Sequence, residues 1–387
     1  MHSKEVDAIA HKPAVVLLAL TLLAVISFVA VTRLVASFNH RQHRLAAQLF
    51  QLGRAERQAG KIDAAIADFR AALRYDRNNY QYELNLALAL VDAKRYDQAR
   101  AYLLSLWDRA PQDGYVNVAL ARLYAMQGNF DDAVRYYHHA IYGLWGNETG
   151  NQRRQARLEL VDLLLSHNER PQAQAELIAS ASSLPSEPRV HQQIADGFMR
   201  AQDYHDALRE YREVLTLDRN NAAALAGAGE AAFQLGQYRA ARYYLQLATQ
   251  HGYPDPRIAQ LLKTADLILE SDPTQRGLPD ADRRRRLADA FSQAEQRLQQ
   301  CANARGEDLS PPPSLSAPTS RLQHLQANWL AMRSHVLRGS FRGDMTAADD
   351  ALDVVFRIEQ ETLAECGQPE GKDLALLFIS RNREVER

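Results

Sequence analysis

Small and large apolar positions alternate at fixed distances along most of the chain, between short polar stretches of turn-forming residues. In residues 52–79, "LGRAERQAGKIDAAIADFRAALRYDRNN", Ala65 and Ala72 flank Phe69. Steps of 34 residues from Gly53, Ala65 and Phe69 reach equivalent small and large positions twice, at Ala87, Ala99, Leu103, Ala121, Ala133 and Tyr137. Residues three or four apart share one helix face, and two helices approach closely where one presents a small side chain. The pattern therefore predicts pairs of antiparallel helices that repeat every 34 residues.

Six such units can be placed on the chain. Three fill residues 46–147, as 46–79, 80–113 and 114–147, and three more follow a short spacer, as 154–187, 188–221 and 222–255. An amphipathic stretch to residue 273 is predicted to cover the exposed side of the last unit, as solenoids require. We therefore expect an α-solenoid of about six helix pairs, divided into 46–147 and 148–273.

The spacing resembles the tetratricopeptide repeat, which has the same period and the same small and large positions. Leu49 and Leu225 stand where that family has a tryptophan, whereas Tyr124 and the terminal prolines Pro111 and Pro185 are retained. The resemblance implies a concave groove that binds peptides or partner proteins, and it implies a protein that is not an enzyme.

The resemblance also implies that the first helix of each unit lines the groove. The residues implied to face it are Arg54, Arg57, Asn85, Asp92, Arg122, Glu159, Asp162, Asp196, Glu230 and Phe233. Their first half leans basic, and the second half carries one acid per unit at Asp162, Asp196 and Glu230. Two interpretations stay open: a split groove whose acidic half prefers a basic segment of a partner, or a solvated face with chance register.

Residues 13–36 predict a transmembrane helix that follows a tail at residues 1–12. The run "PAVVLLALTLLAVISFVAVT" holds twenty residues without a charge, which as a helix is about 30 Å and matches the hydrocarbon core of a bilayer. A cleaved signal peptide is the alternative, but its apolar region is usually about 7–15 residues. Lys4 and Lys12 on one flank, against Arg33, Arg41 and Arg44 on the other, slightly favour a cytoplasmic C-terminal side, although the rule weakens before a large domain.

Residues 280–387 predict a C-terminal helical bundle with a proline-rich loop at 309–319. The two cysteines of the chain, Cys301 and Cys366, end the first and third of these helices. In an up-down-up bundle these ends lie on the same side, so a disulfide is possible, and two buried thiols are the alternative. A disulfide would indicate an oxidising compartment. We therefore expect a single-pass protein of the inner membrane whose soluble part is periplasmic rather than cytoplasmic.

The composition and the local motifs argue against several functions. Lys and Arg total 46 against 47 Asp and Glu, so no basic excess suggests nucleic acid as a partner. No local motif suggests a catalytic, cofactor or metal site. The sequence thus predicts an all-α, membrane-anchored scaffold or adaptor that binds proteins during the assembly or organisation of a membrane or envelope complex. The alternatives are a fixed structural subunit of a large membrane complex, and a carrier or enzyme with its site in the C-terminal bundle.

Overall fold

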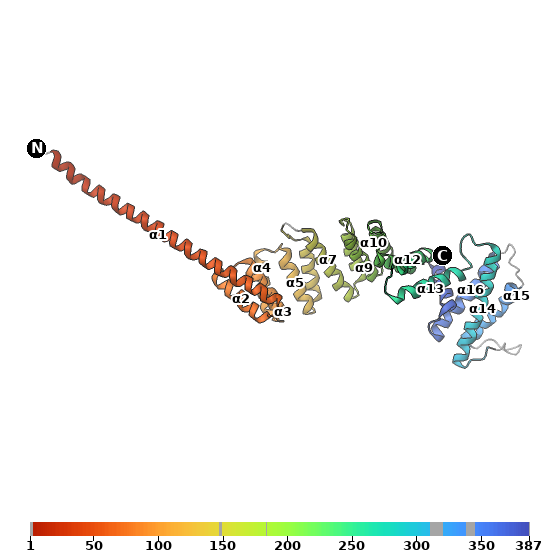
Figure 1. The fold of residues 1–387 in the computed structure, drawn as a ribbon. Coiled ribbons are helices and arrows are strands. Elements are labelled where there is room, and N and C mark those ends of the chain that lie inside the picture. The colour runs from red at the N-terminus through yellow and green to blue at the C-terminus, as the bar shows by residue number, and fades with distance from the viewer. Residues whose placement is uncertain (1–2, 147–148, 183, 310–319, 338–344, 387) are drawn as a thin grey trace. The chain divides into compact units, whose positions relative to one another are not determined.

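The computed structural model describes the chain apart from residues 1–2, 147–148, 183, 310–319, 338–344 and 387 (Figure 1). It contains two compact units, Met1–Ser166 and His167–Arg387, which we describe separately. Throughout the described part, regular structure is helical except for one isolated bridge between Asp113 and Leu144. The all-α prediction is therefore confirmed.

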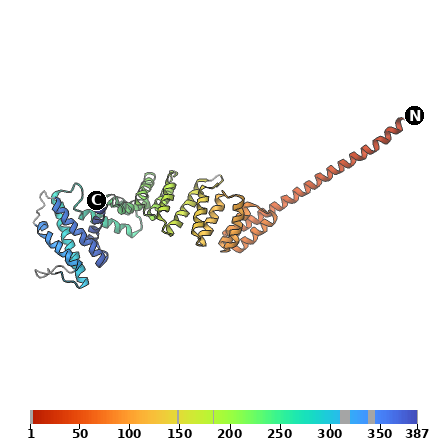
Figure 2. The same ribbon diagram turned by 180° about the vertical axis from the view of Figure 1, so that it is seen from behind.

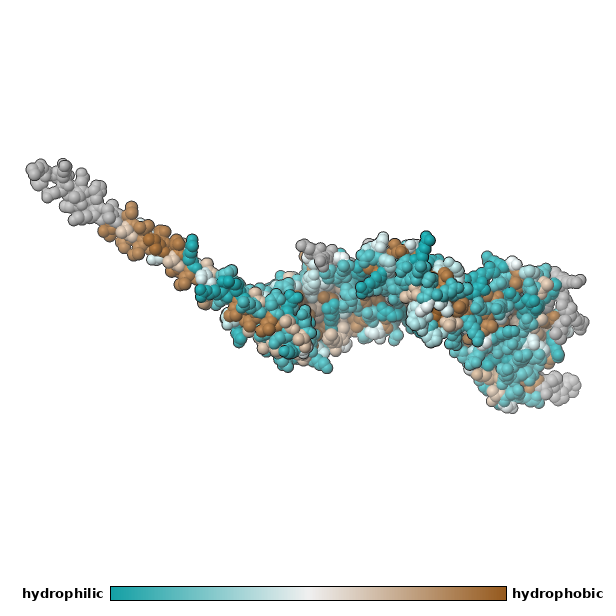
Figure 3. Space-filling model, in the orientation of Figure 1, coloured by the Kyte–Doolittle hydropathy of each residue, from teal (hydrophilic) through white to brown (hydrophobic). Residues whose placement is uncertain are grey.

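The first unit begins with one long helix, α1 (Ser3–Gln58), of 56 residues. It carries the apolar run and continues without a break into the first repeat. The portion from Val16 onward is long and apolar enough to cross a membrane, and its most apolar window is 0% buried. Figure 3 shows the apolar part of this helix in brown, followed by a teal stretch that leads to the repeats. The stretch between the apolar run and the repeat, "TRLVASFNHRQHR", contains neither glycine nor proline, so no residue there favours a helix end.

The repeats of the first unit alternate between two classes of helix, which we call first and second helices by their order within each pair. The first helices are the end of α1, α3 (Tyr80–Asp92), α5 (Gly114–Met126) and α7 (Thr149–Ser166); the second helices are α2 (Ile62–Tyr75), α4 (Tyr96–Arg109) and α6 (Phe130–Tyr142). Phe69 is 0% exposed, and a Cβ placed on Gly53 would lie 2.8 Å from its ring. The small and large positions of the sequence are thus packing partners.

Side chains at the repeat boundaries hold the helix starts. Asn79 accepts hydrogen bonds from the amides of Gln81 and Tyr82 at the start of α3, and Asp113 accepts one from the amide of Val116 at the start of α5. Such caps satisfy amides that have no partner within the helix. The repeat boundaries in the sequence are therefore also the points where each first helix is fixed.

The second unit starts with α8 (Arg170–Ala181), α9 (Pro188–Arg200), α10 (Tyr204–Leu217), α11 (Ala222–Gln234), α12 (Tyr238–Gln250) and α13 (Pro256–Ser271). Of these, α9 and α11 are first helices, and α8, α10 and α12 are second helices. Helix α13 packs on α11 and α12, in the place that a further first helix would take.

Four helices complete the second unit: α14 (Asp280–Arg305), α15 (Arg321–Leu337), α16 (Met345–Cys366) and α17 (Gly371–Glu386). Helices α14, α15 and α16 pack against one another, and a disulfide joins Cys301 to Cys366 with their Cα atoms 5.6 Å apart. The proline-rich loop expected at 309–319 lies outside the described residues from position 310 onward.

The last helix, α17, contacts α13 as well as α14 and α16. The Phe378 ring lies 5.1 Å from that of Phe233 on α11, and the Tyr238 hydroxyl donates a hydrogen bond to the Phe378 carbonyl at 3.4 Å. In Figure 2 this helix is the dark blue segment that ends near the label C. The end of the chain is therefore packed onto the end of the repeats.

Candidate functional site: the inner face of the repeats

The first helices form the inner side of each set of repeats. In the first unit the backbone of α3 lies close to those of α1 and α5, and that of α5 lies close to that of α7. No two second helices of the described first unit approach in this way; Arg70 on α2 reaches Gln98 on α4 by a side-chain hydrogen bond of 2.9 Å. In the second unit, α9 and α11 are likewise close. Closer spacing on one side curves a stack toward that side, so the inner surface belongs to the first helices.

Each first helix exposes one narrow stripe on this surface. On α3 the stripe is Asn85, Leu88 and Asp92, while Leu86, Ala87 and Leu90 are 0% exposed. On α5, Val116 to Ala121 are buried, whereas Tyr115 is 40% and Met126 59% exposed. The spacing of three, four or seven residues follows from the helix period. The stripe is therefore the part of α3 and of α5 that stays accessible on this surface.

Two ion pairs join the stripes of neighbouring first helices. Arg57 on α1 donates from Nε to Asp92 on α3 at 2.6 Å. Arg122 on α5 donates to both carboxylate oxygens of Glu159 on α7, at 2.7 and 2.8 Å. Each pair lies on adjacent first helices, so these residues form part of one surface in the first unit.

Glu159 accepts a further hydrogen bond from a side chain behind it. The Tyr137 hydroxyl of α6 lies 3.3 Å from Glu159 Oε2 and donates to it. Burial acts to raise the pKa of Glu159, but the hydrogen bonds and positive charge of Arg122 outweigh it and lower the pKa below its ordinary value. The same bonds raise the pKa of Arg122, against the effect of its own burial. This pair is therefore ionised and held in a set geometry at neutral pH.

The charge pattern differs from the one expected. The first half of the inner face was predicted to lean basic, but Arg57 and Arg122 are each neutralised by an acid one repeat further on. Arg54 is placed with its guanidinium carbon 5.9 Å from the centre of the Phe50 ring. Asn85 donates to the carbonyl of Gln81, and Asp162 is exposed on α7. The inner face of the first unit is thus mixed in charge.

In the second unit the acids of the inner face have neighbours of their own. Asp196 on α9 accepts from the Tyr211 hydroxyl at 2.7 Å and from Gln192 at 2.9 Å. Burial, and then the Asp196 carboxylate, raise the pKa of Tyr211. Glu230 is half-buried on α11, which is the next first helix. Gly227, also on α11, lies so close to the Tyr211 ring that any side chain at this position would collide with it. Asp196 and Glu230 therefore lie on one surface with Tyr211 below them.

Phe233 does not lie on an open surface. It is 4% exposed, between the Tyr238 ring at 5.3 Å and the Phe378 ring at 5.1 Å. Helix α17, more than a hundred residues later in the sequence, covers it. Periodicity within the repeats carries no information on this contact, so Phe233 was counted as accessible.

Sequence reasoning also missed Tyr115, Met126 and Tyr137. The first two place exposed apolar surface on the stripe of α5, and the third supports Glu159. The two ion pairs could have been predicted from the sequence, because their partners stand 35 and 37 residues apart, which is close to one repeat length. Opposite charges on successive first helices at about that separation predict a bridge.

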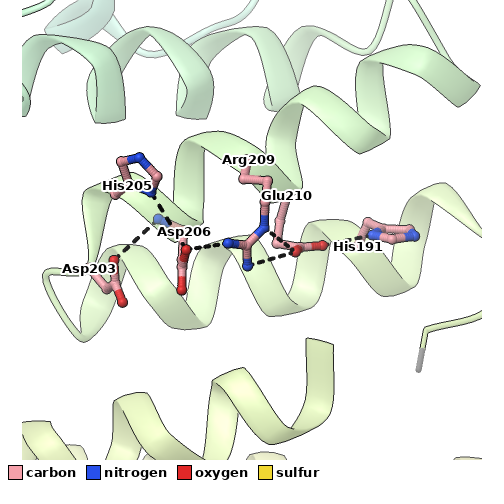
Figure 4. A network of polar contacts seen from close by, with 6 residues as sticks. All are labelled: His191, Asp203, His205, Asp206, Arg209 and Glu210. Carbon is pink, nitrogen blue, oxygen red and sulfur yellow. Dashed lines mark hydrogen bonds and ion pairs between the residues drawn. The ribbon is translucent and has the colours of Figure 1, made fainter. Parts of the chain in front are cut away.

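A second polar cluster lies between α9 and α10 (Figure 4). Glu210 is 4% exposed, lies 2.8 Å from Nδ1 of His191 and accepts two bonds of 3.3 Å from Arg209, which also pairs with Asp206. Figure 4 shows His191 approaching the carboxylate from the neighbouring helix, with the other labelled side chains on and next to α10. The cluster ties α9 to α10 and is a packing feature. In the described chain, no group of three or more His, Cys, Asp and Glu is arranged to hold a metal ion.

Stacked helix pairs with an inner face of first helices define an α-solenoid repeat protein. The family model of the tetratricopeptide repeat matches residues 56–117, 90–142 and 198–264. The chain therefore carries tetratricopeptide repeats, as its 34-residue period predicted.

Solved structures with this fold include a functionally characterised pilF of Pseudomonas aeruginosa, at 16% identity over 57% of this chain and 97% of that one, with a TM-score of 0.40. PilW, described as a widely conserved type IV pilus biogenesis factor, has 20% identity over 57% and 97%, with a TM-score of 0.39. The C-terminal part of a repeat-containing protein from Cytophaga hutchinsonii has 12% identity over 85% and 99%, with a TM-score of 0.43. No curated protein matches the chain.

Proposed function

We propose that the chain is a membrane-anchored scaffold or adaptor that holds partner proteins or peptides on the inner face of its repeats, during the assembly or organisation of a membrane or envelope complex. The observation that carries this proposal is the exposed stripe of α3 and α5. These helices are buried on their other sides, yet Leu88, Tyr115 and Met126 stay accessible beside the ion pairs of Arg57 and Arg122.

The chemistry of the stripe suits a polypeptide. Aromatic and methionine side chains supply contact area that adapts to a partner, and arginine with a carboxylate supplies directional hydrogen bonds. The apolar part of α1 provides the anchor, by its length and composition. The disulfide of α14 and α16 supports an oxidising compartment for the soluble part, hence the periplasmic side of an inner membrane.

The inner face can be tested by site-specific photo-crosslinking in native membranes. A benzophenone side chain at Tyr115 or Met126 on the inner stripe is expected to crosslink to a partner polypeptide. The same group at Tyr75 or Tyr142, exposed on second helices, is the matched control. Equal crosslinking from all four positions would remove the inner face as the binding surface.

A charge exchange sharpens this test. Arg122→Glu combined with Glu159→Arg keeps the ion pair and its contribution to folding, but it reverses the charges that a partner meets. We expect unchanged thermal stability and loss of the crosslink from Tyr115. If the crosslink persists, the pair has only a structural role.

Recovery of the crosslinked partner also addresses the nature of the association. A fixed structural subunit would co-purify from mild detergent with its partner at constant stoichiometry, whereas an adaptor would release it on dilution. For sidedness, an impermeant thiol reagent is expected to label Cys301 and Cys366 in cells with a permeabilised outer membrane only after reduction. Labelling only after the inner membrane is broken would place the soluble part in the cytoplasm.

A further inference from the structure

A cleft lies within the second unit, where the end of the repeats meets the C-terminal helices; we call it the junction cleft. It has a volume of about 700 Å³ and is lined by the turn from α11 to α12, the end of α13 and the segment after it, and parts of α14, α16 and α17. This volume is typical of pockets that bind ligands (about 300–1,000 Å³). The cleft is separate from the inner-face stripes described above.

The approach of α17 to the last repeat shapes one wall of the cleft. Gly236, at the turn before α12, has a φ of +69°, and a side chain there would collide with Asn382 of α17. A glycine is therefore needed both for the turn and for the close approach. The wall combines residues that are distant in sequence, so no repeat pattern could have predicted it.

Charge in the cleft is mostly positive. Its lining contains four arginines, Arg239, Arg276, Arg283 and Arg383, against two aspartates, Asp272 and Asp349. Both acids are engaged: Asp349 accepts from Arg383 at 2.7 Å, and Asp272 accepts from the amide and hydroxyl of Thr274 at 2.8 and 2.6 Å.

Two of the arginines stay available. Arg239 and Arg276 are exposed, and neither has an acidic partner within ion-pair distance among the described residues. The lining also contains buried apolar side chains, which form the floor of the cleft; of these, Leu287, Leu352 and Ile379 come from three different helices. The cleft thus joins an apolar floor to a mouth with two free guanidinium groups.

We propose that the junction cleft binds an acidic segment of a partner protein, with aspartate or glutamate side chains on Arg239 and Arg276 and an apolar side chain on the floor. A guanidinium group binds a carboxylate through two parallel hydrogen bonds, and it is weakly hydrated for a cation. The apolar floor selects a peptide over a free anion, because an inorganic anion would leave it uncovered. This gives the C-terminal helices a binding role that does not depend on the inner face.

The test uses the full chain in detergent and fluorescence anisotropy. The probe is a fluorescein-labelled ten-residue peptide that alternates two acidic residues with one leucine; in a matched peptide lysine replaces every acid. The acidic peptide is expected to bind, with an affinity that falls as salt rises, and the lysine peptide is expected not to bind. Binding of both peptides, or of neither, would overturn the proposal.

Charge-reversal variants locate the site. Arg239→Glu with Arg276→Glu is expected to weaken binding of the acidic peptide at least tenfold. Arg219→Glu with Arg284→Glu changes two exposed arginines of the same unit outside the cleft, and it is expected to change binding less than twofold. Equal weakening by both pairs would mean general charge attraction and would refute the site.

Two further experiments separate this proposal from the inner-face proposal and from lipid binding. The Arg122→Glu, Glu159→Arg exchange in the inner face is expected to leave peptide binding unchanged, so failure of one proposal does not carry over to the other. Vesicles containing anionic phosphatidylglycerol are the alternative ligand. If the Arg239 and Arg276 variant loses vesicle binding but retains the peptide, the cleft is a lipid site and the proposal is wrong.

Discussion

The repeats and the C-terminal helices are built on different principles. Across the described repeats, buried polar side chains are few: Asn117, Ser180 and Glu210. The much shorter C-terminal part buries a larger set, Gln326, Glu359, Thr362, Asp373 and Ser380, and adds a disulfide. Repeats are thus specified by the sizes of apolar side chains at fixed spacing, whereas the bundle is specified by particular polar and covalent contacts. The first kind of structure is readable from periodicity, and the second is not.

Glu359 on α16 is the extreme case. It is 0% exposed, and neither of its carboxylate oxygens has a hydrogen-bond partner among the described residues. Burial raises the pKa of Glu359 to about 9. The charge of Asp373 on α17 adds to this shift, and the charge of Arg297 on α14 opposes it. Glu359 is therefore a neutral acid at pH 7, because an ion in this place would lack solvation.

The largest effect is expected where size alone specifies the packing. Phe69→Ala should lower the free energy of unfolding of the first repeats by about 3–5 kcal/mol, because it removes a buried ring and leaves a cavity between α1 and α2. Hydrogen exchange of the α2 and α3 amides measures it. Tyr75→Ala, at an exposed position of the same helix, should cost little. A loss below about 1 kcal/mol for Phe69→Ala would mean that the repeat does not depend on its large position.

The next effect concerns the covalent contact of the bundle. Replacing Cys301 and Cys366 by serine opens a link across 65 positions and should destabilise the bundle by about 2–4 kcal/mol. Faster hydrogen exchange is expected in α14 and α16, with α2 to α6 unchanged. Equal loss in both regions would contradict the view that the two regions are stabilised independently.

A smaller and pH-dependent effect should come from Glu359. Its folded pKa, about 9, is raised above the ordinary value of 4.5, so its contribution to stability is fully present below about pH 4.5 and is lost as pH rises through 9. Between about pH 6.5 and 8 the free energy of unfolding of the bundle should fall by about 2 kcal/mol. Glu359→Gln should flatten this slope and raise the melting temperature at pH 8. A variant with the same slope as the natural chain would show that another group titrates.

The smallest effect is expected for the ion pair of Arg57 and Asp92. Both side chains are about one third exposed, so solvent screens their attraction, and a double-mutant cycle with alanine should give a coupling energy of about 0.5 kcal/mol. Thermal unfolding of the two single variants and the double variant measures it. A coupling energy above about 2 kcal/mol would indicate that the pair holds α1 and α3 together and contributes substantially to stability.

The sequence predicted the parts of the fold that depend on local period. The helix pairs, their small positions and the apolar run of α1 follow from spacing within about 34 residues. The packing of α17 on α11 and α12 could not be predicted, because Phe378 and Phe233 are related by no period. The same holds for the junction cleft, whose arginines come from four separate segments.

The charged residues of the first unit's inner face were predicted on the correct helices but not with the correct charge balance, and Phe233 was wrongly expected to be accessible. The resemblance placed Arg57, Asp92, Arg122 and Glu159 on first helices, where they lie. Their pairing depends on which side chains meet across neighbouring helices, and that follows from repeat geometry rather than from counting charges along one helix. Considering acids and bases one repeat apart would have corrected the predicted basic half.

The continuity of α1 limits how the first repeat can move relative to the apolar run. Ala46, the first buried residue after the apolar run, comes 13 positions after Arg33, the first charge after that run, so the two stand about 20 Å apart along the helix axis. No helix break lies between them, so if the apolar run spans a bilayer as proposed, rotation of that run about its axis would turn the first repeat by the same angle. Each residue inserted into this stretch would rotate the inner face by about 100° about the helix axis and shift it by about 1.5 Å along that axis. Under the proposed function, the length of this stretch would therefore set both the height and the direction in which a partner is held.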